Sequence, residues 1–139
     1  WELHQDQKMD VAQIIPLSKQ AMTIIKSLKA LTGHSPYVFL SPARGEKPLS
    51  DGAVTKALRQ MGYASGEMTA HGFRAMGRTL LDEALEYEPH LIEQQISHTV
   101  RAPLGRAYNR TKHLPQRRKM MQHWADYLES LAHENQHQK

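Results

Sequence analysis

The sequence contains no cysteine, which excludes disulfide bonds, thiolate metal sites and a cysteine nucleophile. It also lacks an apolar run of the roughly 18 to 20 residues that a membrane-spanning helix requires. No signal peptide is recognisable, so we expect a cytosolic protein without a membrane partner. The remaining composition is ordinary for a soluble domain, with 40% hydrophobic and 23% charged residues among 139. A chain of this length can bury one core.

Neither sign of charge dominates the chain. The 18 Lys and Arg residues outnumber the 14 Asp and Glu residues by 4, and 9 His residues could add positive charge. Such a mild basic excess is compatible with nucleic-acid binding but does not require it. The chain begins at Trp1 rather than at a methionine, which leads us to expect a fragment of something longer.

Helical periodicity dominates the sequence after residue 17. It predicts helices over residues 18–32, 51–61, 70–87, 89–98 and 114–133, with one or two further turns over 104–110. Ser50 or Asp51 is expected to cap the second helix, Pro89 suits a first helical position, and Gly33 and Gly62 end the first two helices. Beyond residue 133 the composition is polar, and we expect a frayed tail, of which residues 135–139 are the end.

Apolar residues at helical spacing define the faces expected to be buried. In the helix over 51–61 these residues are Val54, Ala57, Leu58 and Met61. In the helix over 70–87 they are Phe73, Met76, Leu80, Leu81, Ala84 and Leu85. In the last helix they form a seam of Met121, Trp124, Leu128 and Leu131, which could close the chain's own core or dock on a partner.

Two stretches favour extended structure. Residues 1–16 contain β-branched residues closed by Pro16, and residues 7–10 could form the turn of a hairpin that places Lys8 at its tip or arm. Residues 37–40 form an apolar run bounded by prolines, either a brief strand or a buried extended segment. The predicted fold class is therefore mainly α with a small β-hairpin near the start.

The sequence TAHGFR at residues 69–74 is the centre of the functional interpretation. Thr69 is a suitable helix N-cap, because its hydroxyl can accept an amide hydrogen of the first turn. His71, Arg74 and Arg78 are spaced at i, i+3 and i+7, so they share one helix face. Imidazole and guanidinium groups at a helix start suit an oxyanion such as phosphate, although a solvated polar face is the common alternative.

Five side chains suit the cleavage of a phosphodiester without a metal. A tyrosine such as Tyr108 can act as nucleophile and form a covalent phosphotyrosine. An arginine such as Arg74 can donate two hydrogen bonds to phosphate oxygens while staying charged. His71 and His98 can donate hydrogen bonds or transfer protons near neutral pH, and Lys8 can protonate a leaving oxygen.

These residues, in their order and spacing, resemble the catalytic domain of tyrosine recombinases of the phage and prophage integrase family. The resemblance rests on His71-Gly72-Phe73-Arg74, which matches the family's His-x-x-Arg box, and on Ser97-His98 with Tyr108 ten residues after the histidine. Lys8 stands where the family carries a β-hairpin lysine. The sequences around Thr69 and Tyr108 are similar to those of bacterial prophage integrases, and the resemblance covers nearly the whole chain.

The resemblance implies a role for each residue. Tyr108 attacks the scissile phosphate to give a 3′-phosphotyrosyl link, Arg74 and His98 stabilise the transition state, His71 assists, and Lys8 is the general acid. It also implies that no metal or other cofactor is needed. The expected partners are double-stranded DNA attachment sites and further copies of the chain, as a homo-oligomer (tetramer) on DNA. The expected location is the bacterial cytoplasm, associated with the nucleoid.

The resemblance also marks residues 1–134 as a partial catalytic domain. The family carries another arginine in a helix before the hairpin, and this chain begins too late to contain it. Removal of one preorganised donor to a transition-state oxyanion typically costs about 100- to 1,000-fold in rate. We therefore expect the isolated chain to be inactive or strongly impaired.

Further basic residues could contact the DNA backbone. The candidates are Arg78, Arg101, Arg110, Arg117, Arg118 and Lys119. Residues 117–119 place three cations at the start of the last helix, where the helix dipole disfavours positive charge. Phosphate contacts and a solvated basic face are the two alternative interpretations. His133 and His137 have metal-ligand spacing, but they lie in a polar tail without a carboxylate partner, and we predict no metal site.

Two other classes of function compete with strand cleavage and rejoining. A DNA-binding module that uses the same basic face would bind DNA in a salt-dependent way and form no covalent product. A helical protein-interaction domain with an accidental motif would not bind DNA and would be indifferent to Tyr108→Phe. A type IB topoisomerase would share the chemistry, but the local sequence favours an integrase.

Overall fold

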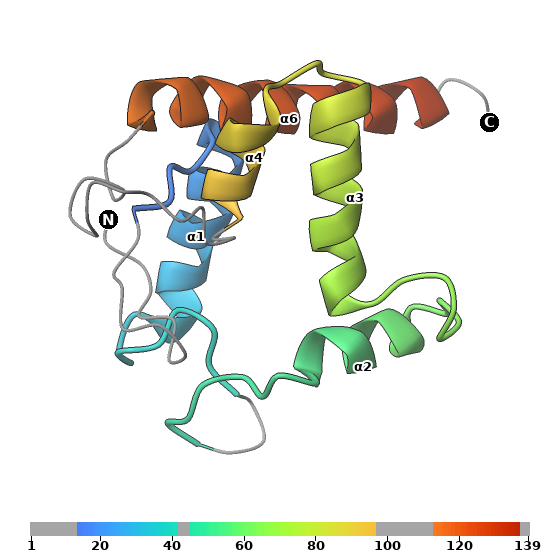
Figure 1. Ribbon diagram of the computed structural model, residues 1–139. Helices are drawn as coiled ribbons and strands as arrows, with labels where there is room; N and C mark the ends of the chain where they lie inside the picture. The colour runs from blue at the N-terminus through green and yellow to red at the C-terminus, as the bar shows by residue number, and fades with distance from the viewer. Residues whose placement is uncertain (1–13, 42–44, 97–112, 137–139) are drawn as a thin grey trace. The chain divides into compact units, whose positions relative to one another are not determined.

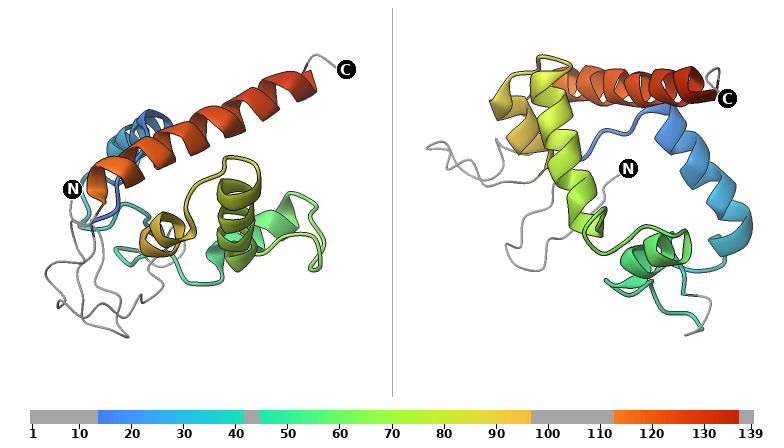
Figure 2. Two further views of the ribbon diagram at one scale, coloured as in Figure 1. Left: turned by 45° about the horizontal axis from the view of Figure 1, so that its top comes forward. Right: turned by 90° about the vertical axis from the view of Figure 1, so that its right-hand side faces the viewer.

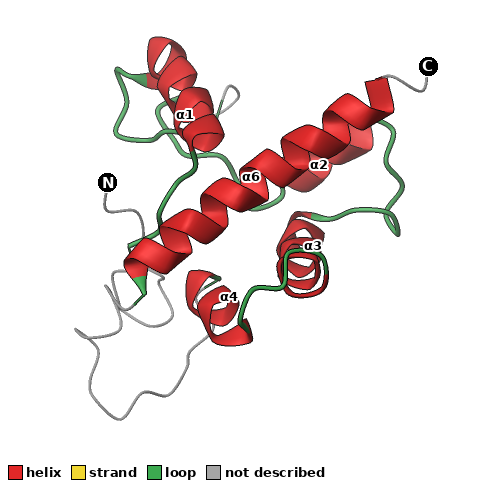
Figure 3. Ribbon diagram, turned by 90° about the horizontal axis from the view of Figure 1, so that it is seen from above, coloured by secondary structure: helices red, strands yellow, loops and turns green. Residues whose placement is uncertain are grey.

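The computed structural model describes residues 14–41, 45–96 and 113–136. Within this described part the chain forms helices and no strand, as Figure 3 shows by colour. The helices are α1 (Lys19–Thr32), α2 (Ala53–Gln60), α3 (Ala70–Glu83), α4 (Pro89–Gln95) and α6 (Leu114–Gln136). The mainly helical class predicted from the sequence is confirmed. None of these helices combines the length and the hydropathy needed to cross a membrane.

The chain divides into two compact units, which are described separately. Unit 1 comprises Trp1–Lys19 and Arg78–Lys139, and unit 2 comprises Gln20–Gly77. The boundary falls inside α3, so the first half of this helix belongs to unit 2 and its last turns belong to unit 1.

Unit 1 has a hydrophobic core where α4 packs against α6 (Figures 1 and 3). The buried residues of this core are Leu81, Leu91, Ile92 and Met120. Leu85, Tyr87, Met121 and Trp124 pack around them. Figure 2 shows the short connection between α3 and α4, which brings the last turn of α3 and the first turn of α4 to the same helix α6. Pro89 begins α4 as predicted, because its missing amide hydrogen is not needed there.

Polar contacts add to this packing in unit 1. The Tyr87 hydroxyl lies 3.1 Å from Nδ1 of His123 on α6, and burial raises the pKa of Tyr87. The rings of His90 and His113 meet edge to face with centroids 5.1 Å apart. The start of α1 is tied to the same helix, because the Lys19 amide donates to Gln122 Oε1 at 2.9 Å. Side chains of α6 therefore contact two separate segments of unit 1, at Tyr87 and at the start of α1.

Unit 2 depends more on hydrogen bonds than on a core. Leu58 is the one hydrophobic side chain that is buried among its described residues. Thr32 Oγ1 at the end of α1 donates to the carbonyl of Val38 at 2.9 Å. An isolated antiparallel bridge joins Leu40 to Pro48. The run at 37–40, predicted to be a strand or a buried segment, is thus limited to one bridge, with Tyr37 and Phe39 exposed.

Several predicted helix faces are wrong in detail. Val54 and Met61, expected to point inward, are 46% and 73% exposed, because α2 has only eight residues and buries only Leu58. Phe73 is 45% exposed, because the α3 residue that enters the buried core is Leu81, which lies in the last turn of the helix. Leu128 is 38% exposed because the contacts of α6 with the core lie in its first half.

Some predicted boundaries also change. α3 ends at Glu83 rather than at 87, and Glu86 has a positive φ of 54°, which breaks the helix. The N-cap of α2 is Gly52, without a side-chain cap, rather than Ser50 or Asp51. α6 continues to Gln136, past the expected fraying at 133.

The hairpin predicted within 1–16 lies outside the described residues except for its end, and Ile14 and Ile15 are irregular there. The turns predicted over 104–110 also lie outside the described residues.

Candidate functional site

The start of α3 is built as the sequence predicts. Thr69 Oγ1 accepts the amide hydrogen of Gly72 at 2.9 Å, so Thr69 is the N-cap of this helix. Gly72 is closely surrounded, because a Cβ atom there would lie 3.0 Å from Met68 Sδ and 3.3 Å from Thr69 Oγ1. The cap and the glycine together fix the backbone that carries His71 and Arg74.

Arg59 of α2 holds the loop that leads to this helix. Its Nη1 donates to the carbonyl oxygens of Tyr63 and Ala64, each at 2.7 Å, and its Nη2 donates to that of Met68 at 2.9 Å. A loop needs partners for its backbone carbonyls, and a guanidinium supplies several donors in a fixed plane. The same loop is closed by a hydrogen bond from the Ala64 amide to Glu67. Arg59 thereby fixes the backbone of the loop that leads into α3.

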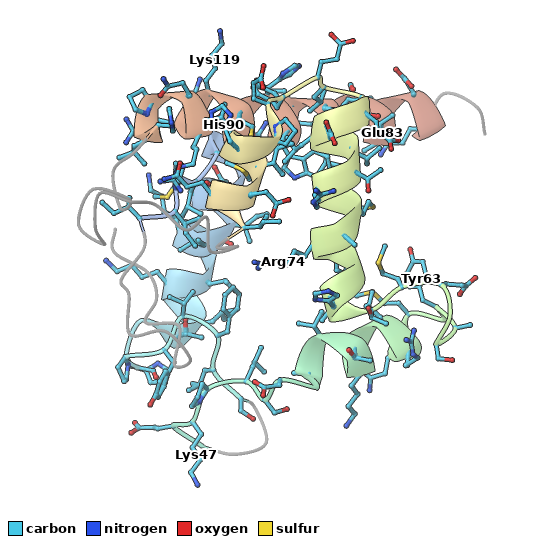
Figure 4. All side chains as sticks on the ribbon, viewed as in Figure 1. Lys47, Tyr63, Arg74, Glu83, His90 and Lys119 are labelled. Carbon is cyan, nitrogen blue, oxygen red and sulfur yellow. The ribbon has the colours of Figure 1, made fainter. Side chains whose placement is uncertain are left out.

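His71 and Arg74 are exposed and lie on one face of α3, one turn apart. Neither side chain makes a hydrogen bond or ion pair with the residues that the structure describes. Figure 4 shows Arg74 projecting away from the axis of the helix. A guanidinium beside an imidazole at the start of a helix can donate several hydrogen bonds to one oxyanion.

Arg78, the third residue of this predicted face, is already paired. Its Nε lies 2.6 Å from Oε1 of Glu93 on α4, with side chains 48% and 22% exposed. A phosphate would have to compete with this carboxylate for the guanidinium. Arg78 therefore differs from Arg74, although the two share a face by sequence spacing.

The three consecutive cations of α6 have different environments. Arg117 is fully buried, and burial lowers the pKa of its guanidinium. Arg118 and Lys119 are exposed, and Figure 4 shows Lys119 projecting outward from α6. The prediction that Arg117 contacts DNA is corrected by its burial, because residues 117, 120, 121 and 124 form the inward stripe of α6.

The structure brings together only part of the predicted site. His71 and Arg74 are adjacent on α3, whereas Lys8, His98 and Tyr108 lie outside the described residues, as do Arg101 and Arg110. Within the described ranges no cluster of three or more His, Asp or Glu residues is suited to hold a metal ion.

Sequence reasoning missed two residues near these segments, Arg59 and Gln95. Gln95 is 7% exposed on α4, and it lies four residues after Leu91 and three after Ile92, on the buried stripe. A polar residue at a position where the helical periodicity predicts an apolar one is a signal that could have identified Gln95. Arg59 gives a weaker signal, a cation placed just before a loop with many backbone carbonyls and few apolar side chains.

Comparison with known proteins shows which proteins the chain is similar to. It is 42% identical to the integrase of Enterobacteria phage P4 over 124 residues, which is 88% of this chain and 28% of that protein. It is 40% identical over 119 residues to prophage integrase IntZ and 35% identical over 123 residues to prophage integrase IntA, both of Escherichia coli K12. These matches cover 85% and 88% of this chain and 29% of each relative. The chain is thus a homologue of phage and prophage integrases, as its motifs suggest.

The homology has a defined extent. The chain spans 28% to 32% of the length of the curated relatives it matches. No family model and no solved structure matches it. The similarity therefore concerns this segment of the relatives and not their whole length.

Proposed function

We propose that the chain is part of the catalytic domain of a tyrosine recombinase that integrates and excises prophage DNA. Strand cleavage and rejoining would be independent of metal and would pass through a 3′-phosphotyrosyl intermediate. Its partners would be double-stranded attachment sites and further copies of the protein, in the bacterial cytoplasm. The identity to phage and prophage integrases over 84% to 91% of the chain is the observation that carries this proposal.

The chemistry follows from the proposed residues. Tyr108 Oη gives its proton to His71 and attacks the scissile phosphorus, a phosphorus–oxygen bond forms, and the bond to the 5′-oxygen breaks. Lys8 gives its proton to that leaving oxygen. Arg74, His71 and His98 donate hydrogen bonds to the non-bridging oxygens, whose negative charge grows in the transition state. Rejoining reverses these steps, because the tyrosyl ester keeps the energy of the broken bond.

The described geometry supports Arg74 and His71 in this role. Both are exposed at the start of α3, and neither is engaged by another described side chain, so binding a phosphate would break no ion pair within the described part of the chain. Arg118 and Lys119 are proposed as contacts to the DNA backbone because they are exposed on α6. Arg101 and Arg110 are proposed from the sequence alone, and Arg78 would bind phosphate only by exchange with Glu93.

The test compares variants of the full-length protein, meaning the natural gene product that contains these 139 residues. Strand cleavage is measured in single turnover on a labelled attachment-site duplex, with DNA affinity measured in parallel. Arg74→Ala should lower the cleavage rate about 100- to 1,000-fold, as the loss of one oxyanion donor does elsewhere. Lys26→Ala, which removes an exposed cation from α1, is the matched control and should leave the rate unchanged.

Equal rates for Arg74→Ala and the control would refute the assignment of Arg74. If the wild-type protein binds attachment-site DNA but never cleaves it, the proposal of a recombinase fails. The molecule would then be a DNA-binding module that uses the same basic residues, and its binding would weaken steeply with salt.

A further inference from the structure

Arg117 is a cation in the interior of unit 1. Its side chain is fully buried, although a guanidinium remains charged in proteins and is costly to remove from water. It lies beside Met120 on the inward stripe of α6, where an apolar side chain would fill the space without that cost. Buried ion-pairing groups can often be replaced by apolar residues of similar volume with no loss of stability. Packing alone therefore does not explain an arginine here.

The contacts of Arg117 join separate segments of the chain. Its Nη2 donates to the carbonyl oxygen of Ile14 at 3.0 Å, and its Nη1 lies 3.4 Å from Oε1 of Gln95. Ile14 precedes α1, Gln95 is the last residue of α4, and Arg117 lies in the first turn of α6. The planar guanidinium thus fixes three backbone segments relative to one another, all within unit 1.

Each of these segments leads directly to one of the proposed catalytic residues. Ile14 lies six residues after Lys8, and Gln95 lies three residues before His98. Arg117 itself lies nine residues after Tyr108.

We propose that Arg117 is a positioning residue, which sets the relative placement of the segments that carry Lys8, His98 and Tyr108. This inference rests on the proposed function. The guanidinium does not touch the DNA in this role. It acts through the backbone carbonyl of Ile14 and the side chain of Gln95, and an error of about 1 Å in the placement of reacting groups can cost about 100-fold in rate.

The experiment separates positioning from stability in the full-length protein. Three properties are measured for each variant: the free energy of unfolding, the DNA dissociation constant, and the single-turnover cleavage rate at saturating DNA. Arg117→Met should lower the cleavage rate about 100-fold, with the dissociation constant within about threefold of wild type. Arg117→Lys keeps the charge but lacks the planar fork of donors, and it should recover part of the rate. Met120→Leu alters the neighbouring buried position on α6 and should cleave at the wild-type rate.

A second variant covers the case in which Arg117→Met does not fold. Gln95→Met keeps the arginine and removes one acceptor, so it should lower the cleavage rate by a smaller factor in the same direction. The proposal is overturned if both folded variants cleave at the rate of Met120→Leu, or if DNA affinity falls as much as the rate. A wild-type protein that binds DNA but forms no tyrosyl adduct would instead refute the proposed function, and the positioning role with it.

Discussion

Unit 1 and unit 2 are held together by different forces. Unit 1 buries the side chains of Leu81, Leu91, Ile92 and Met120 in one cluster where three helices meet. Unit 2 buries a single hydrophobic side chain among its described residues, Leu58, and leaves others such as Ile24 and Leu31 61% and 70% exposed. Its local order comes from capping and from hydrogen bonds to backbone carbonyls, chiefly those of Arg59, Thr32 and Thr69.

This contrast separates two ways of holding functional groups. In unit 1 a buried arginine is supported by a core, and the segments that lead to the proposed catalytic residues are fixed through it. In unit 2 the exposed His71 and Arg74 are presented by a capped helix start and a hydrogen-bonded loop. Substitutions in unit 1 should therefore change global stability, whereas those in unit 2 should change local order.

The largest expected effect tests the core of unit 1. Ile92→Ala should lower the free energy of unfolding by about 2–5 kcal/mol, because it leaves a cavity beside Leu81, Leu91 and Met120. Ile24→Ala removes the same atoms from an exposed site of α1 and should change stability by no more than about 0.5 kcal/mol. Urea denaturation followed by circular dichroism measures both. Similar losses for the two variants would contradict the contrast between the units.

The next effect tests the loop before α3. Arg59→Ala removes hydrogen bonds from a charged donor to three carbonyls and should destabilise the local structure by about 1.5–3 kcal/mol. Hydrogen exchange of the amides over residues 63–72 should accelerate while that of α4 and α6 stays unchanged. Lys56→Ala, on the exposed side of the same helix, is the control. Faster exchange in α6 as well would show that the loop and the unit 1 core are coupled.

A smaller effect is expected at the helix cap. Thr69→Ala removes the acceptor for the Gly72 amide and should cost about 1 kcal/mol. Thr69→Ser keeps the hydroxyl and should restore most of that loss. The measurement is hydrogen exchange of the first turn of α3. If Thr69→Ala exchanges as slowly as the serine variant, the cap does not contribute to the order of this helix start.

The smallest effect is expected at the ion pair of Arg78 and Glu93. Both groups are partly exposed, so a double-mutant cycle with Arg78→Ala and Glu93→Ala should give a coupling energy of about 0.2–1 kcal/mol, smaller at high salt. The cycle is measured by urea denaturation at two salt concentrations. A salt-independent coupling well above this range would mean that the pair is part of the unit 1 core.

Local features were predictable from the sequence, and features that depend on tertiary packing were not. The cap at Thr69, the helix start at Pro89 and the end of α1 before Gly33 follow from short-range chemistry. The burial of Arg117 depends on which face of α6 meets α4. Arg117 lies seven residues before Trp124, so helical periodicity places it on the same apolar face. An arginine, however, is usually expected at the surface. The exposure of Phe73 and Met61 depends likewise on which neighbours their helices have.

The candidate site was predictable only as a set of residue types. The sequence placed His71 and Arg74 together, and the structure bears out their shared, exposed face. It did not show that Arg78 is paired with Glu93, because residues 15 apart in sequence meet only through the packing of α3 on α4. The roles of Lys8, His98 and Tyr108 remain predictions of the resemblance and of the homology to integrases.

Covalent trapping tests whether Tyr108 is the nucleophile. The full-length protein is incubated with a nicked attachment-site duplex, from which the short cleaved strand diffuses away, and the modified peptide is identified by mass spectrometry. We predict DNA linked to Tyr108, with no adduct in Tyr108→Phe. An adduct on a different residue, or none on DNA that the protein demonstrably binds, would contradict it.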